Sequence, residues 1–167
     1  MLVCHIFAIE RKMTMRRTDR EKDKAFALEV FKKAEYLTLA TLNPDNTPYC
    51  IPLNFVLFEN RIYFHCAPEG KKLDNIKANN IVCVTAVGDT RVIPEKMTTR
   101  YESATATGRC VIVEDETEKI NALMALCEKY APGYKEKAEM DIKNMLHRTF
   151  VCKIEMEQIT GKANEAE

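Results

Sequence analysis

The chain has 167 residues, the length of one ordinary domain, so two unrelated catalytic domains are excluded. Hydrophobic residues make up 46% of it and charged residues 30%, which excludes a disordered or collagen-like chain and leaves enough apolar side chain for a substantial core. The 25 Lys and Arg balance the 25 Asp and Glu, so no excess positive charge faces a nucleic-acid backbone, and we expect no nucleic-acid partner.

Both ends of the chain are expected to lie outside the folded domain. Residues 1–9 are apolar, but they include His5 and have neither a preceding basic residue nor a small-residue cleavage site. They therefore fit neither a secretion signal nor a membrane span. We expect residues 1–14 to be a poorly anchored extension, residues 15–162 the single domain and residues 163–167 a frayed tail.

The cysteines indicate the redox environment. There are seven, an odd number, and none belongs to a C-x-x-C pair. A disulfide framework or a zinc knuckle needs paired spacing, so we expect free thiols that pack as small hydrophobes. This usage is typical of the reducing cytoplasm, where we expect the protein to act.

The helices are predicted from caps and from apolar spacing. Thr18 and Glu21 have the spacing of a capping box. Asp115 and Glu118 supply a second cap, and Pro132 and Gly133 break the apolar stripe that follows it. The predicted helices are residues 19–33, a short helix after residue 70 that closes near residue 79, one from about 116 to 130, and residues 134–146.

The strands are predicted where the apolar period changes to two. The first three follow one another through short turns and indicate an antiparallel meander. The polar residues 89–99 indicate an exposed loop, and Gly108 a bend or bulge. The predicted strands are residues 35–42, 49–58, 61–67, 81–88, 102–115 and 149–159. Six mostly antiparallel strands with flanking helices indicate an α+β sheet or small barrel, with closure favoured because an open edge invites aggregation.

The standard catalytic signatures are absent from the sequence. It contains no G-x-G-x-x-G, no P-loop, no H-E-x-x-H and no G-x-S-x-G. His5, His65 and His147 are far apart and have no ligand-like neighbour at metal spacing, so we expect no metal site.

The most informative local feature is Gly70-Lys71-Lys72, directly after a predicted strand and at the start of a predicted helix. Free N–H groups at a helix N-terminus, two ammonium groups and a glycine that allows close approach fit a phosphate. Solvated lysines near a turn produce the same pattern, so this tripeptide alone leaves both interpretations open.

Two further features stand on neighbouring predicted strands. Pro52 interrupts the middle strand of the meander, and proline cannot donate to a ladder, so it indicates an edge where backbone groups remain free for a ligand, or a simple edge strand or bulge. His65 shares one strand face with Arg61 and Tyr63, and the pattern alone favours a hydrogen-bonded structural histidine over a ligand-binding one.

Taken together, these segments resemble a known family. They are MRRTDRE at residues 15–21, YCIPLNF at 49–55, RIYFHCAPEGKKLDNIKANNIVCV at 61–84, YESATATGR at 101–109 and IEMEQITGK at 154–162. In this order they are similar to the pyridoxamine 5'-phosphate oxidase-like flavoproteins, in particular to the 5-nitroimidazole-resistance branch. The resemblance implies a six-stranded split β-barrel that forms a homodimer, with FMN, or alternatively FAD, at the subunit interface.

The resemblance also implies roles for particular residues. Pro52, Leu53, Asn54 and Phe55 would line the flavin ring, chiefly through backbone groups, and His65 and Cys66 would lie beside it. Gly70, Lys71 and Lys72 would hold the phosphate, with Arg100 and Ser103 as further cofactor contacts. Glu102 departs from the family pattern because relatives often have arginine there, so we expect Glu102 to point away from the phosphate or Arg100 to compensate its charge.

The function implied is a flavin-dependent reductase that passes electrons to a nitroaromatic or another small organic molecule, with His65 as the catalytic hydrogen-bond or proton donor. Two alternatives stay open. One is a flavin-binding redox protein without turnover, and the other is a haem-handling split barrel with His65 or His147 as axial ligand.

Overall fold

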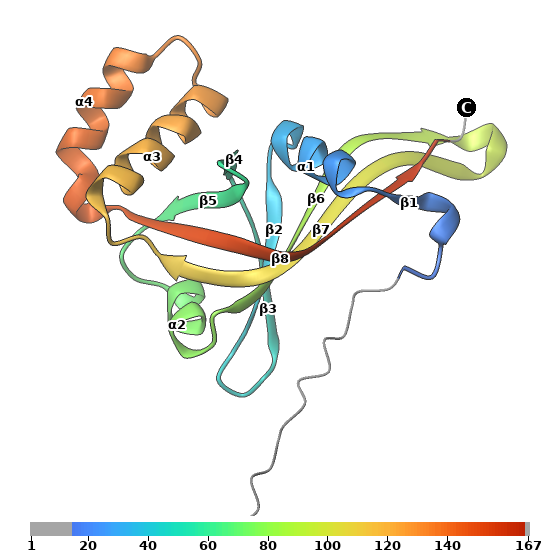
Figure 1. Ribbon diagram of the computed structural model, residues 1–167, viewed down its shortest axis with the longest axis horizontal. Coiled ribbons are helices and arrows are strands. Elements are labelled where there is room, and N and C mark those ends of the chain that lie inside the picture. Colours follow the sequence, from blue (N-terminus) through green and yellow to red (C-terminus); the bar gives the residue numbers. More distant parts are fainter. Residues whose placement is uncertain (1–14, 166–167) are drawn as a thin grey trace, which may run out of the picture.

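The protein forms a single curled antiparallel sheet flanked by helices (Figure 1). The structure is a computed structural model that describes residues 15–165, so the expectations for residues 1–14 lie outside the described part. The strand order is β3-β2-β6-β7-β8-β5-β4, and β1 pairs with β8. The α+β split-barrel class is confirmed, with eight strands instead of the predicted six. The strands are β1 (Glu21–Lys22), β2 (Leu37–Leu42), β3 (Pro48–Leu53), β4 (Val56–Phe58), β5 (Arg61–Cys66), β6 (Ile81–Ile93), β7 (Thr98–Ile112) and β8 (Phe150–Asn164).

Four α-helices accompany the sheet: α1 (Lys24–Lys33), α2 (Lys71–Ala78), α3 (Glu116–Tyr130) and α4 (Lys135–Met145). The predictions for the last three are confirmed within two residues. Helix α1 begins later than predicted, because the Asp23 carboxylate, and not Thr18, accepts from the Phe26 N–H at 2.8 Å. Residues 18–20 form a 3₁₀ turn before β1.

Two predictions were wrong: residues 49–58 as one strand and residues 89–99 as a loop. The segment 49–58 is not one strand, since the chain leaves β3 after Leu53 and enters β4 at Val56, on the opposite edge of the sheet. The meander is therefore two hairpins, β2–β3 and β4–β5. Residues 89–99 are not a loop, because β6 and β7 continue as a hairpin to a 3₁₀ turn at Pro94–Lys96. Exposed side chains such as Val92 and Met97 left no apolar alternation there.

The remaining features of the sheet concern β8 and its partner. Gly108 lies at a register shift between β7 and β8, as predicted. Strand β8 extends to Asn164, so residues 163 and 164 belong to the sheet and not to the expected tail. The outer halves of β6 and β7, together with the end of β8, form an arm that projects away from the helices α3 and α4 (Figure 1).

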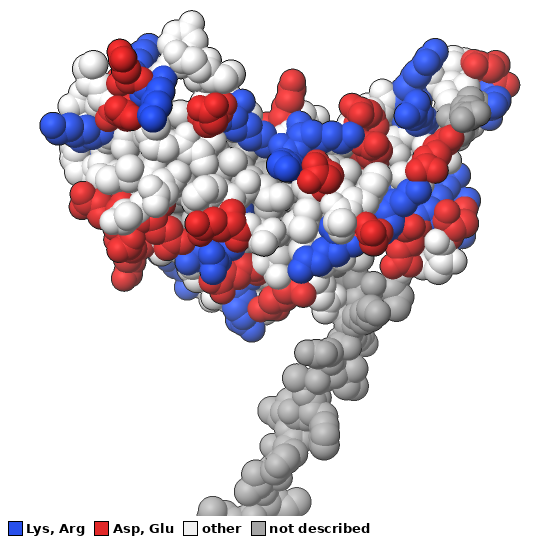
Figure 2. Space-filling view, turned by 45° about the horizontal axis from the view of Figure 1, so that its top comes forward, with Lys and Arg blue, Asp and Glu red and all other residues white. Residues whose placement is uncertain are grey.

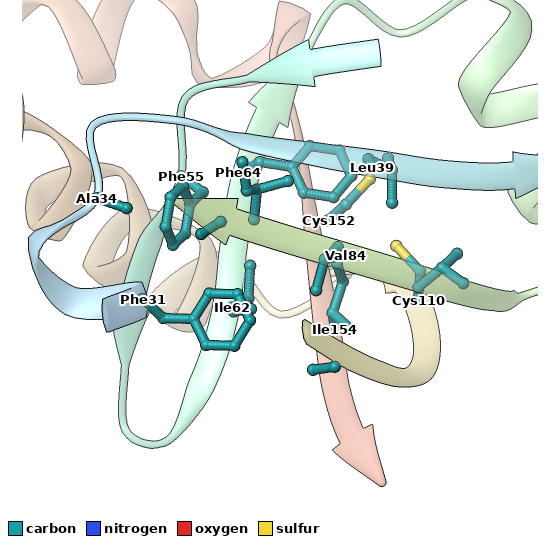
Figure 3. Packing of buried hydrophobic residues seen from close by; sticks show 14 of the residues in the cluster. Phe31, Ala34, Leu39, Phe55, Ile62, Phe64, Val84, Cys110, Cys152 and Ile154 are labelled. Atoms are coloured by element: carbon teal, nitrogen blue, oxygen red, sulfur yellow. The ribbon is translucent and has the colours of Figure 1, made fainter. Parts of the chain in front are cut away.

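Two apolar clusters hold the fold together. The first fills the inside of the curled sheet and includes Phe31 of α1, Phe55, Phe64, Val84 and Ile154 (Figure 3). All five are buried, and each such side chain contributes about 1.5–3 kcal/mol. The second lies on the outside of the sheet and joins α3 and α4 to it through Val56, Tyr63, Val113, Ala122, Leu123, Leu126, Ile142 and Val151. The helical pair therefore covers the outer face of β4 and β5.

Gly108 is required by the close approach of β7 and β8. A Cβ atom at this position would lie 2.0 Å from the backbone oxygen of Glu155, which cannot move without breaking the ladder. We expect Gly108→Ala to lower the free energy of unfolding by at least about 3 kcal/mol, as measured by urea denaturation.

Gly88→Ala is the matched control. Its Cβ would meet only the side chains of Glu102 and Lys33, which can turn away, so a small loss is expected. Equal losses in the two variants would contradict the backbone clash.

Candidate functional site

A cavity of about 400 Å³ lies between the α3–α4 hairpin and the outer face of the sheet. Asn54, which follows β3, and His65 of β5 line it from the side of the sheet, and Asp141 and Thr149 add two further polar groups. The helices contribute a largely apolar wall of Leu123, Leu126, Ile142 and Met145. Two residues that the sequence analysis singled out thus meet in one cavity.

His65 reaches this cavity because of the alternation of β5. The predicted alternation of faces is confirmed: Ile62, Phe64 and Cys66 point into the barrel interior, whereas Tyr63 and His65 lie on the side of the helices. Tyr63 is buried by α3, where its hydroxyl donates to the Glu118 carboxylate at 2.8 Å, and burial together with this bond raises the pKa of Tyr63 to about 12. His65 has no such cover and remains available to a ligand.

The electrostatic environment of His65 keeps its ring neutral. His65 is exposed at the cavity, but partial desolvation there lowers the pKa of its ring below its ordinary value, and the positive charge of Lys72 lowers it further. Lys72 therefore lies close enough to His65 to act on its titration. At neutral pH the imidazole carries one N–H, which can donate a hydrogen bond without a net charge.

Gly70 and the two lysines begin α2 as predicted. Gly70 has φ +130° and is the N-cap, no side chain caps the helix, and open space surrounds the position of a Cβ. The Lys71 charge acts on Asp45 in the β2–β3 turn, so the two lysines face different neighbours. The arrangement suits an anion, because the end of the helix and Lys72 are both positive and accessible.

Asn75 fixes α2 against the sheet. Its side chain is fully buried, and its amide group donates to Thr41 Oγ1 and to Asn43 Oδ1, both at 3.0 Å. These two bonds hold the helix beside β2, and with it the position of Lys72.

The Pro52–Phe55 segment occupies the edge that proline predicted. Pro52 lies on β3, whose only strand partner within residues 15–165 is β2, and Pro52 pairs there with Thr38. Phe55 is fully buried against Phe31, and its N–H donates to the Tyr130 hydroxyl at 2.9 Å. Phe55 is thus part of the core, with its N–H engaged, while Asn54 is exposed at the cavity, and Leu53 is half-buried.

The other predicted site residues lie elsewhere. Cys66 points into the core, where a hydrogen bond with Cys152 and burial raise the pKa of its thiol. Arg100 and Ser103 lie on the arm, Arg100 across from Arg91 and Ser103 with its hydroxyl donating to the Lys162 carbonyl at 3.4 Å. Within one chain they do not share the cavity with His65.

Glu102 has a partner that the sequence analysis missed. It forms an ion pair with Lys33 of α1, and Lys33 also bonds Asp89 at 2.9 Å. Lys33, and not Arg100, therefore compensates the carboxylate. Figure 2 shows acidic and basic side chains interspersed over the viewed face, which therefore has no large patch of one sign. The potential at His65 is set by individual neighbouring charges such as that of Lys72.

Lys129 and Tyr130 at the end of α3 were also missed. The Lys129 Nζ lies 3.9 Å from the centroid of the Phe55 ring and has no hydrogen-bond partner within residues 15–165. The Tyr130 hydroxyl donates to the Glu35 carbonyl at 2.6 Å. The apolar stripe of this helix was visible in the sequence, but the stripe does not show what the last turn touches.

Comparison with protein families assigns the chain. The family model described as pyridoxamine 5'-phosphate oxidase matches residues 23–163. The chain therefore belongs to the pyridoxamine 5'-phosphate oxidase family. No curated protein matches it.

Several solved structures are similar to it. A protein from Bacteroides thetaiotaomicron, provisionally described as a 5-nitroimidazole antibiotic resistance protein, has 27% identity and a TM-score of 0.70 over 86% of this chain and 89% of its own. A flavocytochrome from Azotobacter vinelandii has 16% identity and a TM-score of 0.78, over 94% and 75%. The FAD binding protein from Mycobacterium smegmatis has 22% identity and a TM-score of 0.62, over 88% and 99%. The last two support the fold alone.

In residues 15–165 no group of three or more His, Cys, Asp or Glu side chains is arranged to hold a metal ion. None of the helices in that range has the length and apolar character needed to cross a membrane.

Lys129 makes stability depend on pH. Desolvation lowers the pKa of Lys129 from 10.5 to about 8, so between these values the unfolded chain binds more protons and the free energy of unfolding rises with pH. Below pH 8 the full penalty is present. We expect Lys129→Met to be more stable than the wild type at pH 7 by ~1 to 2 kcal/mol, less than the full value of about 1.4 kcal/mol per pKa unit, because the half-buried ammonium group keeps part of its hydration.

Urea denaturation of both proteins at pH 7 and pH 10 measures this difference, which should shrink at the higher pH. Lys137→Met, on the exposed side of α4, removes the same charge and should show no such change. A difference between Lys129→Met and wild type that stays constant with pH would disprove the desolvation of Lys129.

Proposed function

We propose that this chain is a flavin-dependent reductase that passes electrons to a nitroaromatic or another small organic acceptor. One observation supports it above the rest: Asn54, which follows the proline-bearing edge strand, and the His65 imidazole line one cavity, and the positive charge of Lys72 acts on His65. The names of the similar structures agree with this, since they include FAD binding proteins and a provisional nitroimidazole resistance protein.

The residues present fit a phosphorylated flavin. Gly70 leaves open space at the N-terminus of α2, where no side chain among the described residues caps the helix. A phosphate there can accept from the free N–H groups and from the half-buried Lys72 ammonium group. We assign the phosphate to Gly70, Lys71 and Lys72, and the ring to the backbone of Leu53 and Asn54. FMN, with its single phosphate, is our first choice and FAD the alternative. When bound, the flavin supplies the electron transfer.

His65 supplies what the acceptor needs besides electrons. A nitro group that takes up two electrons and two protons becomes a nitroso group and water, so negative charge must be stabilised and protons delivered. The neutral imidazole of His65 donates its N–H to the acceptor oxygen as that charge develops. The apolar helical wall keeps water from competing for this hydrogen bond.

A homodimer is part of this proposal. Arg100 and Ser103 lie on the arm, outside the cavity of their own chain. The arm of a second copy would bring its Arg100 and Ser103 to the flavin of the first.

We also propose that the protein acts in the cytoplasm, where reduced nicotinamide nucleotides would supply the electrons.

The flavin site is tested by removing one charge. We expect Lys72→Gln to weaken FMN binding at least about tenfold, because a charge-assisted contact of 1.5–3 kcal/mol is lost. Isothermal titration with FMN measures it, and sedimentation of the FMN-loaded protein tests the dimer. Riboflavin, which lacks the phosphate, should bind both proteins equally.

Lys77→Gln, in the last turn of the same helix, is the matched control and should bind FMN as the wild type does. Wild-type protein that binds neither FMN nor FAD at micromolar concentration would refute the proposal. An absorption spectrum with a haem band instead of a flavin band would favour the haem alternative.

The role of His65 is tested by turnover. We expect His65→Ala to retain FMN but to reduce 4-nitrobenzyl alcohol at least about a hundredfold more slowly, because the hydrogen-bond donor is lost. Oxidation of NADH or NADPH followed at 340 nm is the assay. His147→Ala, which alters a different cavity, should behave as the wild type.

Unchanged turnover in His65→Ala would remove this residue from the mechanism. FMN binding without turnover of any acceptor in the wild type would favour the redox protein without catalysis.

A further inference from the structure

The cavity above His65 has a construction of its own. Its helical wall belongs to the second apolar cluster, which is separate from the barrel interior, and its sheet side presents Asn54 and His65. Leu123 and Leu126 come from α3, and Ile142 and Met145 from α4. The cavity is thus bounded by one hydrogen-bonding side and one apolar side.

Its size suits a small ring compound. A volume of about 400 Å³ is at the low end of the range for small-molecule pockets, which are usually apolar with a few polar groups that fix orientation. The neutral His65 ring offers one N–H donor, and the Asn54 amide, which already donates to the Glu35 carbonyl at 3.4 Å, has a second N–H to offer. The bound molecule should therefore present a hydrogen-bond acceptor to the sheet and its ring to the helices.

The charges near the cavity select against anions. Asp141 lines it from α4, and its carboxylate acts on the Cys127 thiol across the same cavity. Lys72 is the nearby cation, but in the proposed function its charge is committed to the flavin phosphate. A ring compound that carries its own carboxylate would therefore be repelled.

Met145 sets the outer limit of the cavity. It lies at the C-terminal end of α4, lines the cavity and is 46% exposed, so it can change size without disturbing the core. Met140 is a methionine of the same helix that is 62% exposed and does not line the cavity.

We infer that the space between the α3–α4 hairpin and β5 is the acceptor pocket, that it selects uncharged single-ring aromatic compounds with their hydrogen-bond acceptor toward His65 and Asn54, and that Met145 determines the ring size. This rests on the proposed function, which it deepens by naming the substrate class and a specificity residue.

The test compares two methionines in the FMN-loaded protein. Met145→Trp fills the pocket and should weaken binding of 4-nitrobenzyl alcohol at least about tenfold, which is the loss of roughly 1.4 kcal/mol. Met140→Trp should leave this affinity as in the wild type. FMN affinity, measured in parallel, should be unchanged in both variants.

Two further variants keep the inference falsifiable if Met145→Trp folds poorly. Met145→Ala enlarges the pocket and should shift preference from 4-nitrobenzyl alcohol toward the two-ring 1-nitronaphthalene. Asp141→Asn should raise the affinity for 4-nitrobenzoate several-fold without changing that for the neutral alcohol.

The outcomes distinguish an error in the pocket assignment from an error in the proposed flavin function. If the wild type binds FMN and Met145→Trp or Met145→Ala leaves the ring preference unchanged, the pocket assignment is wrong while the proposed function stands. If the wild type binds no flavin, the proposed function fails, whatever the ring compounds do.

Discussion

The break between β3 and β4 is the constraint on which the rest of the structure depends. If residues 49–58 ran on as one strand, β4 could not pair with β5 on the far edge of the sheet, and the sheet would stay open. The Tyr130 hydroxyl stabilises the break because it accepts from the Phe55 N–H and donates to the Glu35 carbonyl. A buried peptide group that leaves the ladder must find such a partner. With the chain turned there, Asn54 is placed beside His65 at the cavity.

Lys129 and Lys72 show how the surroundings of a lysine decide whether its charge destabilises the fold or can serve a ligand. Lys129 lies over the Phe55 ring with its ammonium group desolvated and unpaired among the described residues. Lys72 keeps part of its surface in water, next to an uncapped helix end, and acts on His65. The first is a cost to the folded state, and the second is a charge that an anionic ligand can use.

How much of this could be predicted from the sequence depends on the range of the interactions. Local signals worked: Asp115 caps α3, Gly70 begins α2, Pro52 marks an edge and Gly108 marks the bulge. Signals that depend on distant partners failed. Nothing in the sequence around Asn54 shows that the hydroxyl of Tyr130, 76 positions later, will accept from the Phe55 N–H and end the strand. Residues 89–99 are ordered by backbone pairing between β6 and β7, which leaves no apolar period in the sequence. For the candidate cavity, patterns and resemblance singled out Asn54 and His65, whereas Met145 could not be predicted to line it, because the crossing of α4 over the sheet decides which side of the helix faces the cavity.

The division into two apolar clusters explains how one fold can serve different ligands. The barrel interior, which includes Phe31, Phe64 and Ile154, sets the course of the strands and so the positions of Asn54 and His65. The α3–α4 hairpin packs on the outside through its own cluster and contributes the other wall. A change on the exposed side of that wall, as at Met145, alters the shape of the pocket and lies outside both clusters, so the donors on the sheet stay in place. Tyr130 belongs to the helical side but bonds the backbone at the break, so it is the point at which the wall and the barrel constrain each other.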